Sequence, residues 1–169
     1  MEAPAVTLSR ALDPEQRLQH ALDLAFRYLT RRERTVLEMR RYLEGKRVEP
    51  GAIEEALAHL EREDYLNDAR FARQFVEDKR LLEEWGADRI ERRLLTLGVP
   101  AQIVRDTVDV RGRDGELEAA CALLQRRFPT LDGDQRERRR AYGVLVRKGY
   151  DHELAWEAIR AHAGGSDDG

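Results

Sequence analysis

One spacing constrains the fold of this chain more than any other feature: apolar residues in helix-like segments return after 51 residues. Leu43, Leu94 and Leu145 lie 51 residues apart in each step (94 − 43 and 145 − 94). Further apolar positions align in the same register, namely Met39 with Ile90 and Ala141, Ala21 with Ala72 and Leu123, and Ala25 with Val76. Self-similarity at a fixed period of this length is typical of tandem copies of one supersecondary unit.

The repeating unit is helical, because apolar residues recur at steps of three and four and no sustained two-residue alternation occurs. Helix starts are marked by capping residues. Asp13-Pro14-Glu15-Gln16 and Thr35-Val36-Leu37-Glu38 both place an acceptor before the helix and Gln or Glu three residues on. Further starts are expected after Pro50, at Asn67-Asp68 and after Pro100.

Glycines and the junctions around them mark where helices end. The second helix of the first copy is expected to stop near Gly45, and Gly86 and Gly98 are expected to close the first and second helices of the second copy. In the last third, helices are predicted over about 116–128, 134–148 and 151–162. Gly98-Val99-Pro100 and Gly149-Tyr150-Asp151 occupy equivalent junctions before the third helix of their copies.

These patterns predict an all-α protein made of three tandem three-helix units, about nine helices in total. The predicted bounds are 13–66, 67–112 and 113–163, with a flexible tail over 1–12 and a disordered tail over 164–169. Charged residues make up 37% of the chain, which is high for a compact globule. An elongated array, with much surface per residue, would accommodate that charge.

Charge and composition exclude several classes of protein. The net charge of −3 gives no global attraction to nucleic acid or membrane, although local basic faces remain possible. No apolar run approaches the ~18 residues needed to span a bilayer, and the N-terminus lacks the pattern of a secretory signal. Cys121 is the single cysteine and is expected to be a small core residue. A cytoplasmic protein is the simplest interpretation.

Residues that could carry catalysis are not arranged for it. The four histidines (His20, His59, His152 and His162) lie in separate segments without a second ligand at metal spacing. Gly112-Arg113-Asp114-Gly115 lacks the Gly-Lys-Ser/Thr ending of a phosphate-binding loop, and no nucleophile has a neighbouring base. The sequence therefore predicts a binding protein, not an enzyme, with no cofactor and no metal.

Arginines cluster at related places in the three copies. The candidate binding residues are Arg31, Arg32, Arg34, Arg40, Arg41, Arg92, Arg93, Arg138, Arg139 and Arg140. A row of guanidinium groups on the second helix of stacked units would suit a phosphate backbone or an acidic groove on another protein. The alternative is a solvated face balanced by the nearby Glu33, Glu44, Glu91 and Glu137. Both interpretations stay open.

Several segments together resemble one known family. Asn67–Arg80 begins a basic helix, Trp85–Leu94 contains a glycine before an Ile…Leu helix, and Leu97-Gly98-Val99 closes it. This central pattern is similar to the RecX regulatory proteins. The stretch from Ala21-Leu22 to Leu60 is similar to the first unit of that family, and the resemblance runs from about residue 18 to 160.

The resemblance implies a curved helical body that lies in the groove of the RecA–DNA filament. It implies a modulator of the RecA recombinase, mainly an inhibitor, that restrains ATP hydrolysis, strand exchange and co-protease activity in recombination and DNA repair. The implied partner is the RecA filament, with weak direct DNA contact and a monomeric chain. Two other classes stay open: a stand-alone helical DNA-binding protein that regulates transcription, and a helical adaptor for some other protein.

Overall fold

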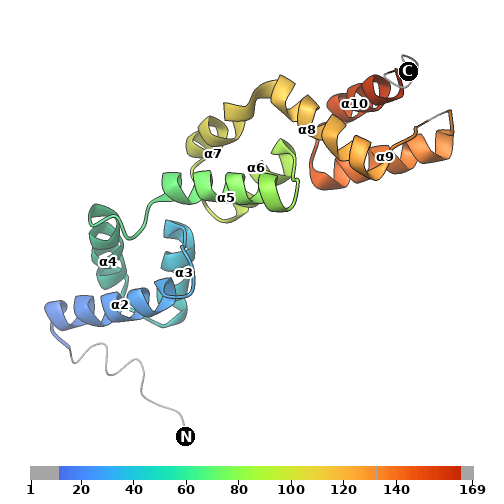
Figure 1. Cartoon of the computed structure of the whole chain (residues 1–169). Helices are drawn as coiled ribbons and strands as arrows, with labels where there is room; N and C mark the ends of the chain where they lie inside the picture. Colours follow the sequence, from blue (N-terminus) through green and yellow to red (C-terminus); the bar gives the residue numbers. More distant parts are fainter. Residues whose placement is uncertain (1–11, 132, 165–169) are drawn as a thin grey trace, which may run out of the picture. The chain divides into compact units, whose positions relative to one another are not determined.

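A computed structural model gives the structure of the chain and describes residues 12–131 and 133–164. Every regular element in these residues is helical, as predicted, and they contain nine α-helices and one 3₁₀ turn. In order, the elements are α2 (Pro14–Leu29), α3 (Val36–Gly45), α4 (Pro50–Arg62), α5 (Asp68–Leu82), α6 (Ala87–Thr96), α7 (Ala101–Val108), η1 (Asp109–Arg111), α8 (Gly112–Arg127), α9 (Gln135–Lys148) and α10 (His152–Gly164) (Figure 1).

Packing divides the chain into two compact units. The first comprises Met1–Phe71 with Leu97–Pro100, and the second comprises Ala72–Thr96 with Ala101–Gly169. In the first unit α2, α3 and α4 pack against one another around a common core. In the second unit α10 packs on both α8 and α9, and α6 packs on α7 (Figure 1).

Both predicted capping boxes are confirmed at atomic detail. Asp13 Oδ1 accepts from Gln16 N at 2.8 Å, and Gln16 Oε1 accepts in return from Asp13 N at 3.1 Å. Thr35 and Glu38 form the same reciprocal pair at the start of α3. Each box satisfies amide groups that the first helical turn leaves without an internal partner.

The 51-residue register also describes the cores. Leu43, Leu94 and Leu145 are fully buried, and so are Met39, Ile90 and Ala141. The first-helix set of Ala21, Ala72 and Leu123 is buried as well. Equivalent positions therefore face equivalent interiors, which is what a repeat of one packing unit requires.

Two predicted helix boundaries differ from those in the structure. Helix α5 ends at Leu82 and not at Gly86, because Glu84 adopts a positive φ of 58° and turns the chain first. Helix α8 begins at Gly112, four residues before the expected start, since η1 leads directly into it. The predicted tails lie outside the described residues, except that Leu12 precedes the cap of α2 and Gly164 is the last residue of α10.

Successive copies of the repeat contact each other at two joints. Each joint lies where the start of a copy's second helix meets residues of the next copy. In the first packing unit, Thr35 Oγ1 donates to Leu97 O at 2.5 Å, and Val36 N donates to Asp68 Oδ1 at 3.0 Å. In the second, Gly86 N donates to Lys148 O at 2.8 Å. A carboxylate again caps the helix there.

Three of the four residues match in the repeat register, although Thr35 donates through its hydroxyl and Gly86 through its backbone N–H, and the two carboxylates come from different positions. Gly86 and Lys148 are the 51-residue equivalents of Thr35 and Leu97. Ala87, the equivalent of Val36, donates its N–H to Glu116 Oε2 at 3.0 Å. In each joint the start of a second helix, α3 or α6, thus contacts a carbonyl at or just beyond the end of the next copy's second helix, and a carboxylate from that copy's first helix. These acceptors suit the positive end of a helix.

Glycine lets the loop approach at each joint. Gly98 has φ +86°, and a Cβ there would lie 2.3 Å from Leu37 Cβ. Gly149 has φ +96°, and a Cβ there would lie 2.6 Å from Arg89 N. The recurring Gly-Val and Gly-Tyr junctions of the sequence are therefore contact points between successive copies, and not only helix stops.

The hydroxyl of Thr35 is predicted to stabilise the first joint measurably. Thr35 is fully buried, accepts from Glu38 N at 3.1 Å and donates to Leu97 O. Thr35→Val removes both bonds and leaves the part-buried Leu97 carbonyl without this donor, so we expect a loss of about 1–2 kcal/mol in the free energy of unfolding. Urea unfolding of the variant and the unaltered protein measures this loss. Thr35→Ser keeps the hydroxyl and should lose much less; equal losses would contradict this role.

Candidate functional site

The predicted arginines of the first repeat divide into paired and unpaired groups. Arg32 Nη2 lies 2.5 Å from Glu38 Oε1, and Arg40 forms two hydrogen bonds with Glu54 across α3 and α4. Arg34 stacks on the Tyr28 ring at 3.9 Å. These three guanidinium groups are therefore already engaged within the protein.

Glu38 shows the strength of this internal pairing. Burial opposes its ionisation, but the hydrogen bonds from Arg32 and from Thr35 N–H, with the charges of Arg32 and Arg34, outweigh burial and lower the pKa of its carboxyl. Glu38 thus remains ionised into the acidic range and keeps Arg32 and Arg34 in place.

The other predicted arginines are less constrained. Arg31, Arg41, Arg92, Arg93, Arg139 and Arg140 are exposed and form no ion pair with a described residue. Arg138 is half-buried, and its Nε has no hydrogen-bond partner within the described chain. Of the proposed balancing carboxylates, Glu33 pairs with Arg70, whereas Glu44, Glu91 and Glu137 form no ion pair with a described residue. These arginines therefore form no direct ion pairs with the carboxylates proposed to balance them, and both interpretations of the clusters, a binding surface and a solvated face, stay open.

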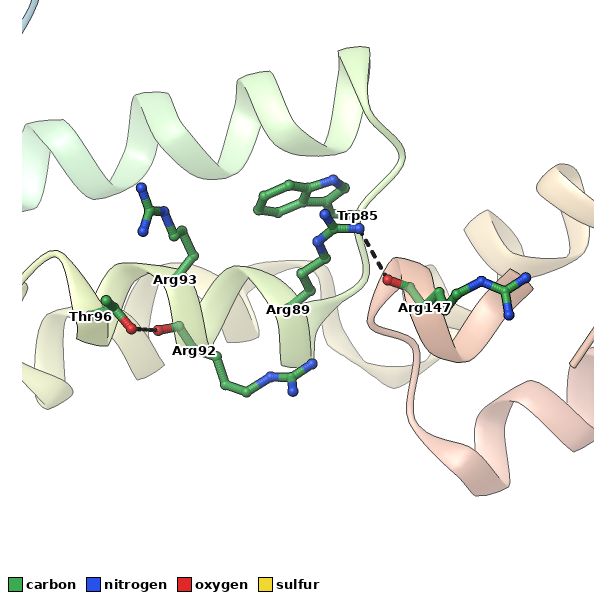
Figure 2. Close-up of a pocket in the computed structure, with 6 residues that line it drawn as sticks. All are labelled: Trp85, Arg89, Arg92, Arg93, Thr96 and Arg147. Carbon is green, nitrogen blue, oxygen red and sulfur yellow. Dashed lines mark hydrogen bonds between the residues drawn. The ribbon is translucent and has the colours of Figure 1, made fainter. Parts of the chain in front are cut away.

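The structure gathers two of the predicted residues, Arg92 and Arg93, into a cationic pocket of the second packing unit. The pocket has a volume of about 390 Å³ and is lined by Trp85, Arg89, Arg92, Arg93, Thr96 and Arg147 (Figure 2). Helix α6 supplies Arg89, Arg92 and Arg93 because they lie three and four residues apart and so share one side of the helix.

Arg89 links the parts of the pocket. Its guanidinium stacks on the Trp85 ring at 4.0 Å, and its Nη1 donates to Arg147 O at 3.0 Å (Figure 2). Lys79 also lies over the Trp85 ring, 4.8 Å from its centroid. Trp85 is thereby held by two cations, and Arg89 is fixed in one orientation.

The remaining guanidinium groups keep donors free. Arg92 uses its Nε on Asp88 O at 3.2 Å, and Arg92 O accepts from Thr96 Oγ1 at 2.8 Å. Arg93 and the side chain of Arg147 form no ion pair with a described residue. These guanidinium groups point in different directions (Figure 2). Each can bind a phosphate or carboxylate group separately, because planar guanidinium groups donate in pairs to such anions.

Sequence reasoning missed Trp85, Arg89 and Arg147. Arg89 could have been found, since it precedes Arg92 and Arg93 by one helical turn. Arg147 lies 58 residues from Arg89 and reaches the pocket through the second joint. In the 51-residue register, Arg92 and Arg93 correspond to Gly143 and Val144, so the cluster Arg138–Arg140 does not repeat their position.

Comparison with known proteins places the chain in a family. Models of the first, second and third three-helix domains of RecX match residues 21–60, 67–108 and 114–159, in chain order. The chain belongs to the RecX family. RecX regulatory proteins are not enzymes, so family membership agrees with the prediction of a non-catalytic protein.

Relatives named "Regulatory protein RecX" match most of the chain. The protein of Deinococcus radiodurans is 34% identical over 146 residues, which is 86% of this chain and 70% of the relative. That of Trichlorobacter lovleyi is 35% identical over 134 residues, 77% of this chain and 87% of the relative.

Solved structures agree in fold. The crystal structure of RecX from Lactobacillus salivarius superposes with a TM-score of 0.77 at 20% identity, covering 88% of this chain and 97% of the other. A second crystal structure of a regulatory protein RecX gives a TM-score of 0.73 at 18% identity, covering 95% and 79%. At these identities the likeness concerns the fold.

Metal-ligand clusters and membrane-spanning helices are absent from the described residues. No group of three or more His, Cys, Asp and Glu side chains there is placed to hold a metal ion. None of the helices described has both the length and the apolar character to cross a membrane.

Proposed function

We propose that this RecX-family protein regulates a RecA recombinase by binding in the groove of the RecA–DNA filament. In this role it acts mainly as an inhibitor that restrains ATP hydrolysis, strand exchange and co-protease activity. It acts as a monomer in the cytoplasm, and its direct contact with DNA is weak.

The observation that carries the proposal is the tandem repetition of one RecX domain with the same joint. A filament presents the same surface many times, and linked domains that each bind weakly gain affinity through effective concentration. Family membership supports the choice of partner, since RecX relatives are named as regulatory proteins.

The cationic pocket offers a surface that could contact the filament. Arg92 and Arg93 carry donors that no described carboxylate engages, whereas Arg32 and Arg40 are paired within the protein. We therefore propose that Arg92 and Arg93 contact the filament. Arg31, Arg41, Arg139 and Arg140 are candidates for further contacts, and the paired arginines contribute less.

Adding the protein to RecA-coated single-stranded DNA tests the proposal. ATP hydrolysis and strand exchange should fall as the protein approaches equimolar amounts with RecA. No effect at an equimolar amount would contradict the proposal. Tight, sequence-selective binding to duplex DNA without RecA would instead favour a stand-alone DNA-binding protein, because phosphate contacts alone give weak, salt-dependent binding.

A further inference from the structure

The start of α9 differs from the starts of α3 and α6. Helix α9 begins at Gln135, three residues before Arg138. Arg138 is the repeat equivalent of Val36 and Ala87 (138 − 102 and 138 − 51). Those two residues donate their backbone N–H to a carboxylate of the next copy, whereas Arg138 N donates to Asp134 O at 3.0 Å. The added turn of α9 thus satisfies internally an amide that a neighbouring copy satisfies in the other two cases.

The side chains that follow at the start of α9 are open to solvent. Leu37 in the first copy and Arg89 in the second each lie against a glycine of the next copy. Their equivalents in the third copy, Arg139 and Arg140 (37 + 102 and 89 + 51), are exposed and form no ion pair with a described residue. The face that the next copy covers in the first two repeats, here called the joint face, is therefore uncovered by any described residue in the third.

A pocket lies at the joint face of the third copy. It has a volume of about 260 Å³ and is lined by Arg127, Phe128, Glu137, Arg140 and Val144. The last three lie three and four residues apart on α9 and so share one side of that helix. The first two come from the end of α8. We call this site the α8–α9 pocket.

The α8–α9 pocket combines positive charge, apolar surface and one carboxylate. Arg127 and Arg140 are exposed, and neither pairs with a described carboxylate. Phe128 is buried and Val144 is half-buried, so both offer apolar surface at the pocket. Glu137 is half-buried and forms no ion pair with a described residue. The pocket thus presents donors for carboxylates, an acceptor for an N–H group and a place for an apolar side chain.

We propose that the α8–α9 pocket binds an acidic segment of another protein, in which an apolar side chain lies beside the carboxylates. Arg127 and Arg140 each hold a carboxylate, Phe128 and Val144 contact the apolar side chain, and Glu137 accepts a backbone N–H of the segment. This interaction goes beyond the proposed function, because it requires neither a recombinase nor DNA.

Two observations favour a protein segment over nucleic acid as the occupant. The joint faces of the first two copies already receive protein carboxylates, from Asp68 and Glu116. The carboxylate of Glu137 would repel a phosphodiester chain, whose backbone offers no N–H donor in return. A peptide carries both acceptors and donors and therefore matches the mixed lining.

Fluorescence anisotropy of labelled peptides mixed with the full chain tests the proposal. The probe is a short peptide in which pairs of glutamates alternate with leucine, and the matched control peptide has glutamine in place of every glutamate. We expect the acidic peptide to bind about tenfold or more tightly than the glutamine peptide, because only the carboxylates form charge-assisted contacts with arginine.

Substitution of the two pocket arginines locates the bound peptide. Arg127→Gln combined with Arg140→Gln should weaken binding of the acidic peptide about tenfold or more. Arg105→Gln combined with Arg160→Gln removes the same charge at exposed sites of the second packing unit outside the pocket. This control should change the affinity less than about twofold at physiological salt. All four side chains are exposed, so helix content by circular dichroism should not change in either pair.

Val144→Thr tests the apolar contact separately. Threonine has nearly the shape of valine but places a hydroxyl at the pocket, so the leucine-bearing acidic peptide should bind about threefold more weakly. A peptide of glutamate alone, of the same length, should bind this variant as it binds the unaltered protein. An equal change for both peptides would contradict the apolar contact.

Three further results would overturn the proposal: equal binding of the acidic and glutamine peptides, unchanged affinity after loss of Arg127 and Arg140, or tighter binding of single-stranded oligo-dT through the same two arginines. The last result would assign the pocket to nucleic acid. No recombinase is present in the peptide experiments. They can therefore fail while filament inhibition holds, or succeed while it does not.

Discussion

Gly149→Ala should destabilise the protein by about 2–5 kcal/mol. Gly149 has φ +96° and ψ 22°, where a residue with a Cβ costs roughly 1–2 kcal/mol. The added Cβ would also lie 2.6 Å from Arg89 N and 2.9 Å from Arg89 Cα, so the backbone of α6 must move away. Overpacking of this kind adds about 1–3 kcal/mol. Urea unfolding followed by circular dichroism measures the loss.

Gly133→Ala separates the two causes. Gly133 also has a positive φ, +78°, but a Cβ there would meet nothing within 4 Å. This variant should show only the cost of the backbone conformation, about 1–2 kcal/mol. If Gly149→Ala costs no more than Gly133→Ala, the joint tolerates the added group, and close approach of Gly149 to Arg89 is not what requires glycine.

The sequence could predict the features of the fold that depend on nearby residues or on the repeat period. Caps such as Asp13 and Thr35 act over three or four residues, and their partners are adjacent in the sequence. The core positions Leu43, Leu94 and Leu145 follow from a period, which needs no knowledge of tertiary contacts. Gly98 and Gly149 were visible as a recurring junction, but the residues they approach were not.

Long-range pairing is where sequence reasoning stopped. Arg40 pairs with Glu54, which lies on another helix, and nothing in the local pattern distinguishes it from the unpaired Arg41. Arg147 enters the pocket because the α9–α10 loop docks on α6. The sequence could therefore find clusters of arginine but not determine which of them remain free to bind.

Phe75 illustrates the same limit. Its place on the apolar stripe of α5 predicts burial, yet Phe75 is only half-buried and packs edge-on against Trp85 at 6.2 Å. Phe71 and Val76, on the same stripe, are buried. The stripe of α5 is wider than its core contact, so the loss expected for Phe75→Ala falls below that of a fully buried phenylalanine.

Reversing two charges in the pocket should have the largest effect on function. Arg92→Glu combined with Arg93→Glu should raise the concentration needed for half-inhibition of RecA ATP hydrolysis about a hundredfold or more. Each lost charge-assisted contact is worth about 1.5–3 kcal/mol, and 1.4 kcal/mol corresponds to a tenfold change in affinity. Both side chains are exposed, so helix content by circular dichroism should not change.

A matched pair separates position from net charge. Arg105→Glu with Arg160→Glu makes the same change in charge at exposed sites of the second packing unit outside the pocket. This control should inhibit nearly as well as the unaltered protein, apart from a modest change at low salt. Equal loss in both pairs would mean that filament binding depends on overall charge. Full inhibition by the pocket variant would mean that other faces make the contact, and the unpaired Arg31, Arg41, Arg139 and Arg140 would be the next to reverse.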